Sequence, residues 1–169
     1  MGLNSKSKAM KNPNKILKIV LFSLLTPVFA NNIIAQDKAS IIKQAVKDSK
    51  FIFHAQVAMP ASGGSRQLSS DYDLKISKNS LVSYLPFFGR AYSVPYGTTD
   101  GGLSFTSSKF DYAIKNRKKG GWEISIEPKD VPEFREFLLT VSESGYGTLQ
   151  AVSNNRQLIS FSGYITPAE

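Results

Sequence analysis

Apolar and polar residues alternate along most of this chain after residue 50, which is the pattern of β-strands that bury one face. The segments that show it are 51–59, 72–77, 80–85, 110–115, 122–127, 136–142, 146–152 and 157–164. Most of the links between them are short, and short links favour antiparallel neighbours. The sequence therefore predicts a mainly β domain, an antiparallel meander of about eight strands that closes as a barrel or folds as a sandwich.

The clearest hairpin is predicted at 110–127, where two alternating segments flank a turn at 116–121. A dense positive cluster, 115–119, occupies the tip of this hairpin. Charge at a hairpin tip is solvated and blocks pairing with other strand edges. We therefore interpret the cluster as a solvated turn in preference to a site for an anionic partner.

One α-helix is predicted before the strands, over residues 37–50. Ile41, Ile42, Ala45 and Val46 fall on one face of this helix, and lysines occupy much of the rest. Because an apolar helix face needs an apolar partner, we expect the helix to pack against the β-domain.

The first 35 residues have the pattern of an export signal. Five lysines and no acidic residue precede an uncharged apolar stretch at 19–30. That stretch is shorter than the ~20 apolar residues that a membrane-spanning helix needs. We expect a signal peptide over 1–35, cleaved after Ala35 or Ala30, and a single β-rich domain over 36–169.

Removal of the signal changes the charge and defines the expected compartment. Loss of its five lysines lowers the formal net charge from +8 to +3, so no nucleic-acid partner is expected. The chain has no cysteine, which excludes disulfides and a lipid-anchored cysteine. The sequence therefore predicts a periplasmic or secreted protein that is not a lipoprotein and has no integral membrane span after signal removal.

Few residues suggest catalysis. His54 is the only histidine, and we interpret it as a solvated or hydrogen-bonded surface residue. Asp71 and Asp73 point to one side of their strand, a spacing at which two carboxylates can share a proton or a cation. Lys75 continues the same row, which favours an ordinary polar sheet face. No catalytic residue, metal ligand or cofactor is assigned, and an envelope carbohydrate-active enzyme that uses the Asp71–Asp73 pair remains the alternative function.

The most unusual segment is 84–97, which holds five aromatic residues, two prolines, two glycines and one arginine. In a structural interpretation, Gly89 takes a special backbone conformation, the aromatics fill the core and Arg90 bonds carbonyls that the prolines leave free. In a functional interpretation, the segment forms the mouth of a pocket where a guanidinium and stacked rings hold a ligand. The ligand-binding residues would then be Arg90, Tyr84, Tyr92 and Tyr96.

Several motifs in this order resemble a secreted Bacteroidetes family catalogued as domain of unknown function 4251. They are LPFFGRAY at 85–92, DGGLSF at 100–105, SGY at 144–146, SNNRQ at 153–157 and ISFSG at 159–163. The family more often has Tyr where this chain has Phe87, and Ala where it has Gly147. The resemblance covers about residues 50–165 and implies an exported β-rich domain with a lipocalin-like barrel. It implies no established activity and no catalytic residues.

For function, these patterns favour an exported, non-catalytic domain of the cell envelope. Its expected partner is a small amphipathic ligand or another envelope component, and no cofactor is expected. A nucleotide or hydrolase function is disfavoured because the chain lacks a phosphate-binding loop and a Gly-x-Ser-x-Gly elbow.

Overall fold

The computed structural model describes residues 30–90 and 102–168, with side chains from Asp37 onward. Within these residues one helix, α2 (Ala30–Lys47), precedes nine strands. The strands are β1 (Phe51–Pro60), β2 (Arg66–Ser77), β3 (Ser80–Leu85), β4 (Leu103–Ser107), β5 (Phe110–Asn116), β6 (Trp122–Pro128), β7 (Phe134–Val141), β8 (Tyr146–Ser153) and β9 (Ile159–Pro167).

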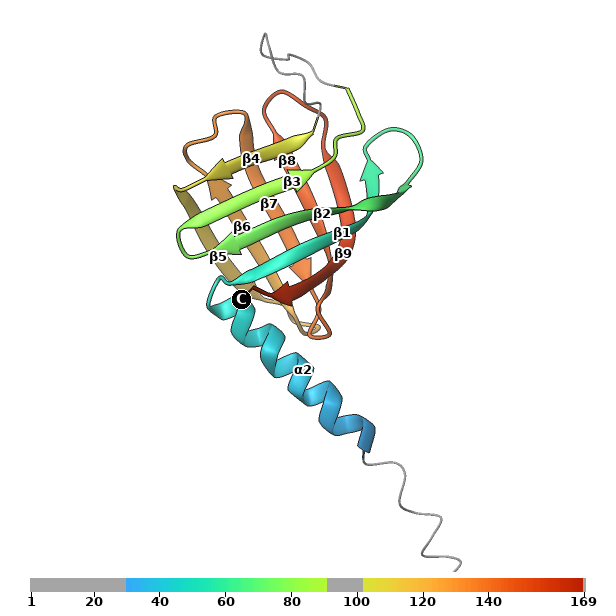
Figure 1. Cartoon of the computed structure of the whole chain (residues 1–169), viewed down its shortest axis with the longest axis vertical. Helices are drawn as coiled ribbons and strands as arrows, with labels where there is room; N and C mark the ends of the chain where they lie inside the picture. Colours follow the sequence, from blue (N-terminus) through green and yellow to red (C-terminus); the bar gives the residue numbers. More distant parts are fainter. Residues whose placement is uncertain (1–29, 91–101, 169) are drawn as a thin grey trace, which may run out of the picture. The chain divides into compact units, whose positions relative to one another are not determined.

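The nine strands form one antiparallel sheet in the order β4-β3-β2-β1-β9-β8-β7-β6-β5, which curls into a nearly closed barrel (Figure 1). The predicted antiparallel β-barrel with one N-terminal helix is therefore confirmed, and so is the hairpin at 110–127, formed by β5 and β6. The strand that the prediction missed is β4. It has only five residues, and one of its buried positions is the polar Ser107. Leu103 and Phe105 alternate with Ser104 and Thr106, but a run of four residues that ends at a polar inward position is too short to predict a strand.

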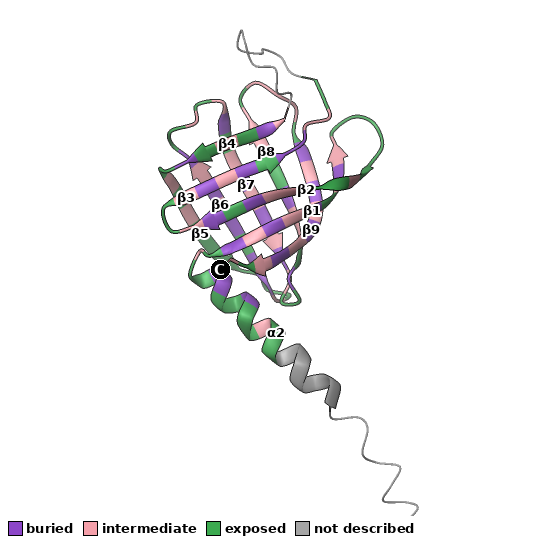
Figure 2. Ribbon diagram, viewed as in Figure 1, coloured by how far each residue is buried: buried purple, intermediate pink, exposed green. Residues whose placement is uncertain are grey.

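Alternate residues of the strands point into the barrel and fill it with apolar side chains (Figure 2). The large side chains that are fully buried include Phe51, Phe53, Phe137, Phe161, Leu74, Ile76, Ile124 and Ile126. The predicted alternation in β1 fails after Ala55, since Ala58 is buried while Val57 and Met59 are only half-buried. The reason is a β-bulge: Ala55 pairs with Gly163 and Val57 with Ser162, so Gln56 is an extra residue in the ladder with β9. The ladder with β2 changes register at the same place, but there the extra residues are 68–71 of β2.

Helix α2 begins before the predicted residue 37 and ends before the predicted Lys50. The preceding residues from Ala30 contain no proline or glycine that would stop a helix. The end is set by Ser49, whose φ of 54° is left-handed. The N–H of Ser49 bonds to the carbonyl of Val46, and the N–H of Lys50 bonds to the carbonyl of Ala45. These two bonds form a Schellman motif, which satisfies carbonyls at the helix end.

The helix packs on the β-domain with part of its predicted apolar face. Ile42, Ala45 and Val46 are buried, whereas Ile41 is 52% exposed, so its predicted place on the buried face is wrong. Tyr112 of β5 donates a hydrogen bond from its hydroxyl to the carbonyl of Val46 at 2.9 Å, and burial raises the pKa of Tyr112. Among the described residues, no helix combines the length and the apolar character needed to cross a membrane.

A single carboxylate stabilises the turn between the two edge strands, β4 and β5. One oxygen of Asp130 accepts a hydrogen bond from the Ser107 hydroxyl, and the other accepts from the Ser108 N–H at 2.9 Å and from the Ser108 hydroxyl at 3.2 Å. These bonds favour the charged form, and they lower the pKa of Asp130 to about 2, with the Ser107 bond as the largest cause.

Asp130 should therefore make the stability of the protein depend on acid. Its pKa is lower in the folded chain than the ordinary value of about 3.9, so the stabilisation is complete above about pH 5 and is lost as the pH falls through 4 towards 2. Asp130→Asn mimics the protonated acid. We expect thermal melts to place this variant below the wild type at pH 7 and to show the two converging near pH 2. An equal gap at both pH values would contradict the assignment.

Candidate functional site

A row of polar and aromatic side chains crosses the outer face of five neighbouring strands. The strand register places Tyr84 of β3 opposite Asp73 of β2, Asp73 opposite His54 of β1, and His54 opposite Tyr164 of β9. Tyr164 in turn lies opposite Tyr146 of β8. The ends of this outer-face row are accessible, since Tyr84 is 52% and Tyr146 is 60% exposed. Exposed aromatic rings in a contiguous row are a feature of binding surfaces.

The rings of this row are held by contacts with one another. The His54 and Tyr164 rings lie 5.0 Å apart between centroids, and the Tyr146 ring meets Tyr164 edge-on at 6.4 Å. At the other end of the row, Tyr84 stacks on Tyr72 at 5.4 Å. Such pairs restrict ring rotation, so the aromatic surface is largely pre-arranged.

A polar cavity opens beside the outer-face row at the β-bulge. Between Gln67 and Tyr72 strand β2 departs from its ladder with β1: Gln67 lies opposite Val57 and Tyr72 opposite Ala55, so residues 68–71 have no partner in β1. The resulting hollow, which we call the bulge cavity, has a volume of about 260 Å³ and is lined by the rings of Tyr72 and Tyr164. Its hydrogen-bonding groups come from His54, Gln56, Gln67, Ser69, Ser70 and Asp71. Bulges often lie beside functional sites because they redirect side chains.

The groups that could act in acid–base catalysis are engaged separately. His54 shares a hydrogen bond between its Nε2 and the Thr166 hydroxyl at 2.9 Å, although Asp73 lies opposite it in the ladder. Asp73 instead forms an ion pair with Lys75 at 3.3 Å. Asp71 lines the bulge cavity and Asp73 does not, so the two carboxylates do not share a cavity. Within the described part of the chain, no three His, Asp or Glu residues lie close enough to hold a metal ion.

The structure describes two of the four predicted ligand-binding residues, and it does not bring these two together. Tyr92 and Tyr96 lie outside the described residues. Tyr84 belongs to the outer-face row, whereas Arg90 is exposed and uses its backbone: its carbonyl accepts from the Gln157 N–H at 3.2 Å, and its N–H donates to the Gln157 side chain at 3.4 Å. No contact between Arg90 and Tyr84 occurs among the described residues.

The structural interpretation of the 84–97 segment needs two corrections. The arginine that bonds a carbonyl is Arg156, which donates to the Gly102 oxygen at 2.9 Å and lies 5.2 Å from the centre of the Phe87 ring. Arg90 makes no such side-chain bond in the described chain. Gly89 does not have a left-handed φ; an added Cβ would lie 2.9 Å from the tip of the Phe87 ring, which would have to shift to make room.

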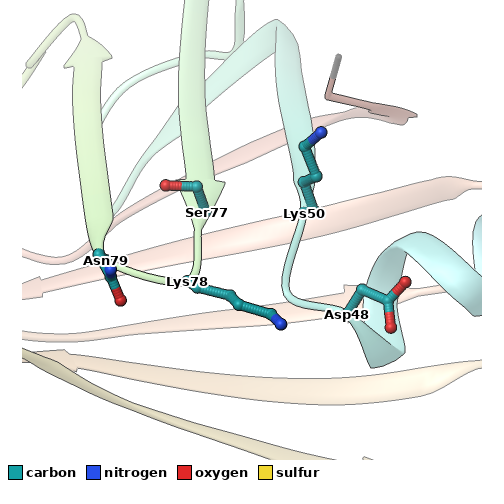
Figure 3. Close-up of a pocket in the computed structure, with 5 residues that line it drawn as sticks. All are labelled: Asp48, Lys50, Ser77, Lys78 and Asn79. Carbon is teal, nitrogen blue, oxygen red and sulfur yellow. The ribbon is translucent and has the colours of Figure 1, made fainter.

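A larger cavity, of about 500 Å³, lies where α2 joins β1 (Figure 3). The side chains that line it do not converge: in Figure 3 Lys50 and Lys78 extend in different directions, and Ser77 points away from both. The carboxylate of Asp48 accepts a hydrogen bond from Gln44 at 2.7 Å. Size alone does not make this cavity a site, because a site needs polar groups directed at a common point. The bulge cavity is the better candidate.

Sequence reasoning missed most of the candidate site. Tyr164, Gln56 and Gln67 carry no motif, and their proximity depends on which strands are neighbours and on the position of the bulge. The available signal was the two-residue period, which places His54 and Gln56 on the outer side of one strand but cannot say what lies opposite them.

Comparisons with known proteins agree with the fold. Residues 34–165 match the family described as Domain of unknown function (DUF4251). The chain is similar to a crystal structure of a DUF4251 family protein from Bacteroides eggerthii, with a TM-score of 0.56 and 17% identity over 77% of this chain and 87% of that one. No curated protein matches the sequence. At this identity, the likeness to the solved structure supports the fold alone.

Proposed function

Since this chain belongs to the DUF4251 family, whose function is unknown, we propose that it is an exported, non-catalytic domain of the cell envelope that binds a small amphipathic ligand or an envelope partner. The observation that carries the proposal is the bulge cavity, where hydrogen-bonding side chains lie beside two tyrosine rings. A ligand with both polar and apolar faces matches this combination.

The arrangement of the remaining groups supports binding over catalysis. The ring of His54 is bonded to Thr166 and the carboxylate of Asp73 to Lys75, so neither is placed to exchange a proton with the other. A carboxylate-pair glycosidase needs both acids facing one cleft. The barrel interior is filled by apolar side chains, which supports a binding surface on the outside of the barrel.

Export is supported by the N-terminal sequence. The lysine-rich start and the uncharged stretch at 19–30 have the composition of a signal peptide. We therefore propose that the domain acts in the periplasm or outside the cell.

Native mass spectrometry of protein recovered from a periplasmic fraction tests both parts of the proposal. We expect the chain mass to lack the N-terminal segment that contains Lys15 and Lys18, and we expect part of the protein to carry a bound ligand. Gln67→Trp places a large ring in the bulge cavity and should remove the bound ligand by steric exclusion, with little change in melting temperature because Gln67 is exposed.

The matched control is Gln150→Trp, the same change at an exposed position on the outer side of β8. This variant should keep the ligand. A periplasmic species that retains Lys15 and Lys18 would contradict cleavage of the signal. Equal ligand retention by the two Trp variants would show that the bulge cavity is not the binding site.

A further inference from the structure

We infer that the ligand of the bulge cavity is an oligosaccharide of uncharged pyranose sugars, which stacks on the tyrosines of the outer-face row and places hydroxyl groups in the cavity. The inference rests on the proposed binding function and adds the chemical class of the ligand. Four observations support it: the exposed rings, the hydrogen-bonding groups of the cavity, the charges of its residues, and the spacing of the rings beside it.

The ring arrangement suits a ligand with flat apolar faces. A pyranose ring exposes C–H groups on its faces and hydroxyls around its edge, and tyrosine offers a rigid, amphipathic surface at low entropic cost. Tyr84 is 52% exposed and is held by its stack on Tyr72, which itself lines the cavity. An apolar stacking surface, formed by the Tyr84 and Tyr72 rings, therefore adjoins the polar bulge cavity.

The cavity supplies the complementary hydrogen bonds. The amides of Gln56 and Gln67 each donate and accept, and the hydroxyls of Ser69 and Ser70 do the same. Sugar hydroxyls also donate and accept, so each can be satisfied by such groups. Hydrophobic lipid chains would leave these polar groups without partners, which costs free energy.

The charges of the site exclude an anionic ligand. No lysine or arginine lines the bulge cavity, and Asp71 is the only acidic residue among those that line it. Asp73, the nearest carboxylate of the row, is paired with Lys75. A phosphate or carboxylate ligand would find no guanidinium or ammonium partner and would be repelled by Asp71.

The spacing of the rings beside the cavity favours an oligosaccharide over a single sugar. Tyr72 and Tyr164, which both line the cavity, lie on β2 and β9, two steps apart in the sheet, which corresponds to roughly 10 Å at about 4.8 Å per step. This distance exceeds one pyranose ring. A chain of two or more sugars can therefore contact rings on both sides of the cavity.

Isothermal titration and saturation-transfer NMR with two probes test the inference: hexamers of β-1,4-linked glucose and of β-1,4-linked N-acetylglucosamine. We expect at least one hexamer to bind the full mature chain and to contact it through ring protons. Tyr84→Ala should raise the dissociation constant at least tenfold, whereas Tyr84→Phe, which keeps the ring, should change it less than threefold. Gln150→Ala, on the exposed side of β8, should have no effect.

The outcomes separate this inference from the proposed function. If neither hexamer binds while native mass spectrometry still shows a ligand that Gln67→Trp removes, the oligosaccharide is wrong and the binding function stands. If that retained ligand is a peptide, the surface is a protein interface and the inference is overturned. If no ligand is retained and neither hexamer binds, both fail. Sugar binding that is unchanged in Tyr84→Ala would also overturn the inference, because the stacking surface would not be used.

Discussion

Gly163→Ala should destabilise the protein by about 3 kcal/mol and lower its melting temperature by about 10 °C. Gly163 lies opposite Ala55 in the ladder between β1 and β9, next to the bulge. A Cβ added there would lie 1.9 Å from the backbone oxygen of His54 and 3.1 Å from the Phe53 ring. Backbone atoms of a central strand cannot move aside as a flexible side chain can, so the two strands must separate locally. Differential scanning calorimetry measures the loss.

The control for this prediction is Gly64→Ala in the loop between β1 and β2. A Cβ at Gly64 would meet no atom within 4 Å, and its φ is not left-handed. We expect this variant to melt within a degree or two of the wild type. Similar melting of the two variants would mean that the β1–β9 ladder tolerates the added methyl, and the close approach of these strands would then not determine stability. Gly163→Ala should also weaken ligand retention, as measured by native mass spectrometry. The reason is that separation of β1 from β9 would displace His54 and Tyr164, which line the bulge cavity.

Arg156→Met should cost about 2 kcal/mol, which corresponds to roughly 7 °C in melting temperature. The change keeps much of the aliphatic stem and removes the guanidinium, so the Gly102 carbonyl loses its donor at 2.9 Å and the Phe87 ring loses its cation. Arg156 is half-buried, so water replaces these contacts only in part. Thermal melts followed by circular dichroism provide the measurement.

The matched variant is Arg90→Met, which makes the same change at the other arginine near this loop. Arg90 is exposed and bonds Gln157 through its backbone, which the substitution leaves intact. We expect its melting temperature to stay within the range of ordinary surface substitutions, about 0.5 kcal/mol. A larger loss for Arg90→Met than for Arg156→Met would restore the interpretation in which Arg90 satisfies the carbonyls of the 84–97 segment.

The position of the predicted pocket shows how far local patterns reach. The density of aromatics in 84–97 led to the prediction that Arg90 lies beside these rings. Within the described chain, the Phe87 ring instead lies against Arg156 and the Phe88 ring against Arg66, two arginines from distant segments. Of the two predicted residues that the structure describes, Tyr84 and Arg90, Tyr84 is the one that lies in the candidate site. Its neighbours there are Tyr72 and, through the row, His54. No local rule connects Tyr84 with those residues, since their contacts span three strands.

By itself the sequence determined the class of fold. Alternation with a period of two commits each strand to one buried face, and a one-residue slip would expose the apolar set, so strand positions and inward residues such as Phe53 and Phe137 could be predicted. Motifs of this chain likewise identified its family, which the match over 34–165 confirms. Alternation and motifs are both patterns among residues that are close in the sequence, so they can be identified without knowing which strands are neighbours.

Only the tertiary structure decided the candidate site. The bulge cavity lies where both ladders of β1 change register after Ala55, with Gln56 extra against β9 and residues 68–71 extra on β2. The outer-face row exists because residues from five strands meet in register, over separations that no periodicity encodes. The burial of alternate residues within one strand produces a pattern that can be recognised in the sequence. Which residues are neighbours on the surface of a sheet depends instead on the order of the strands, and this order is a property of the whole chain.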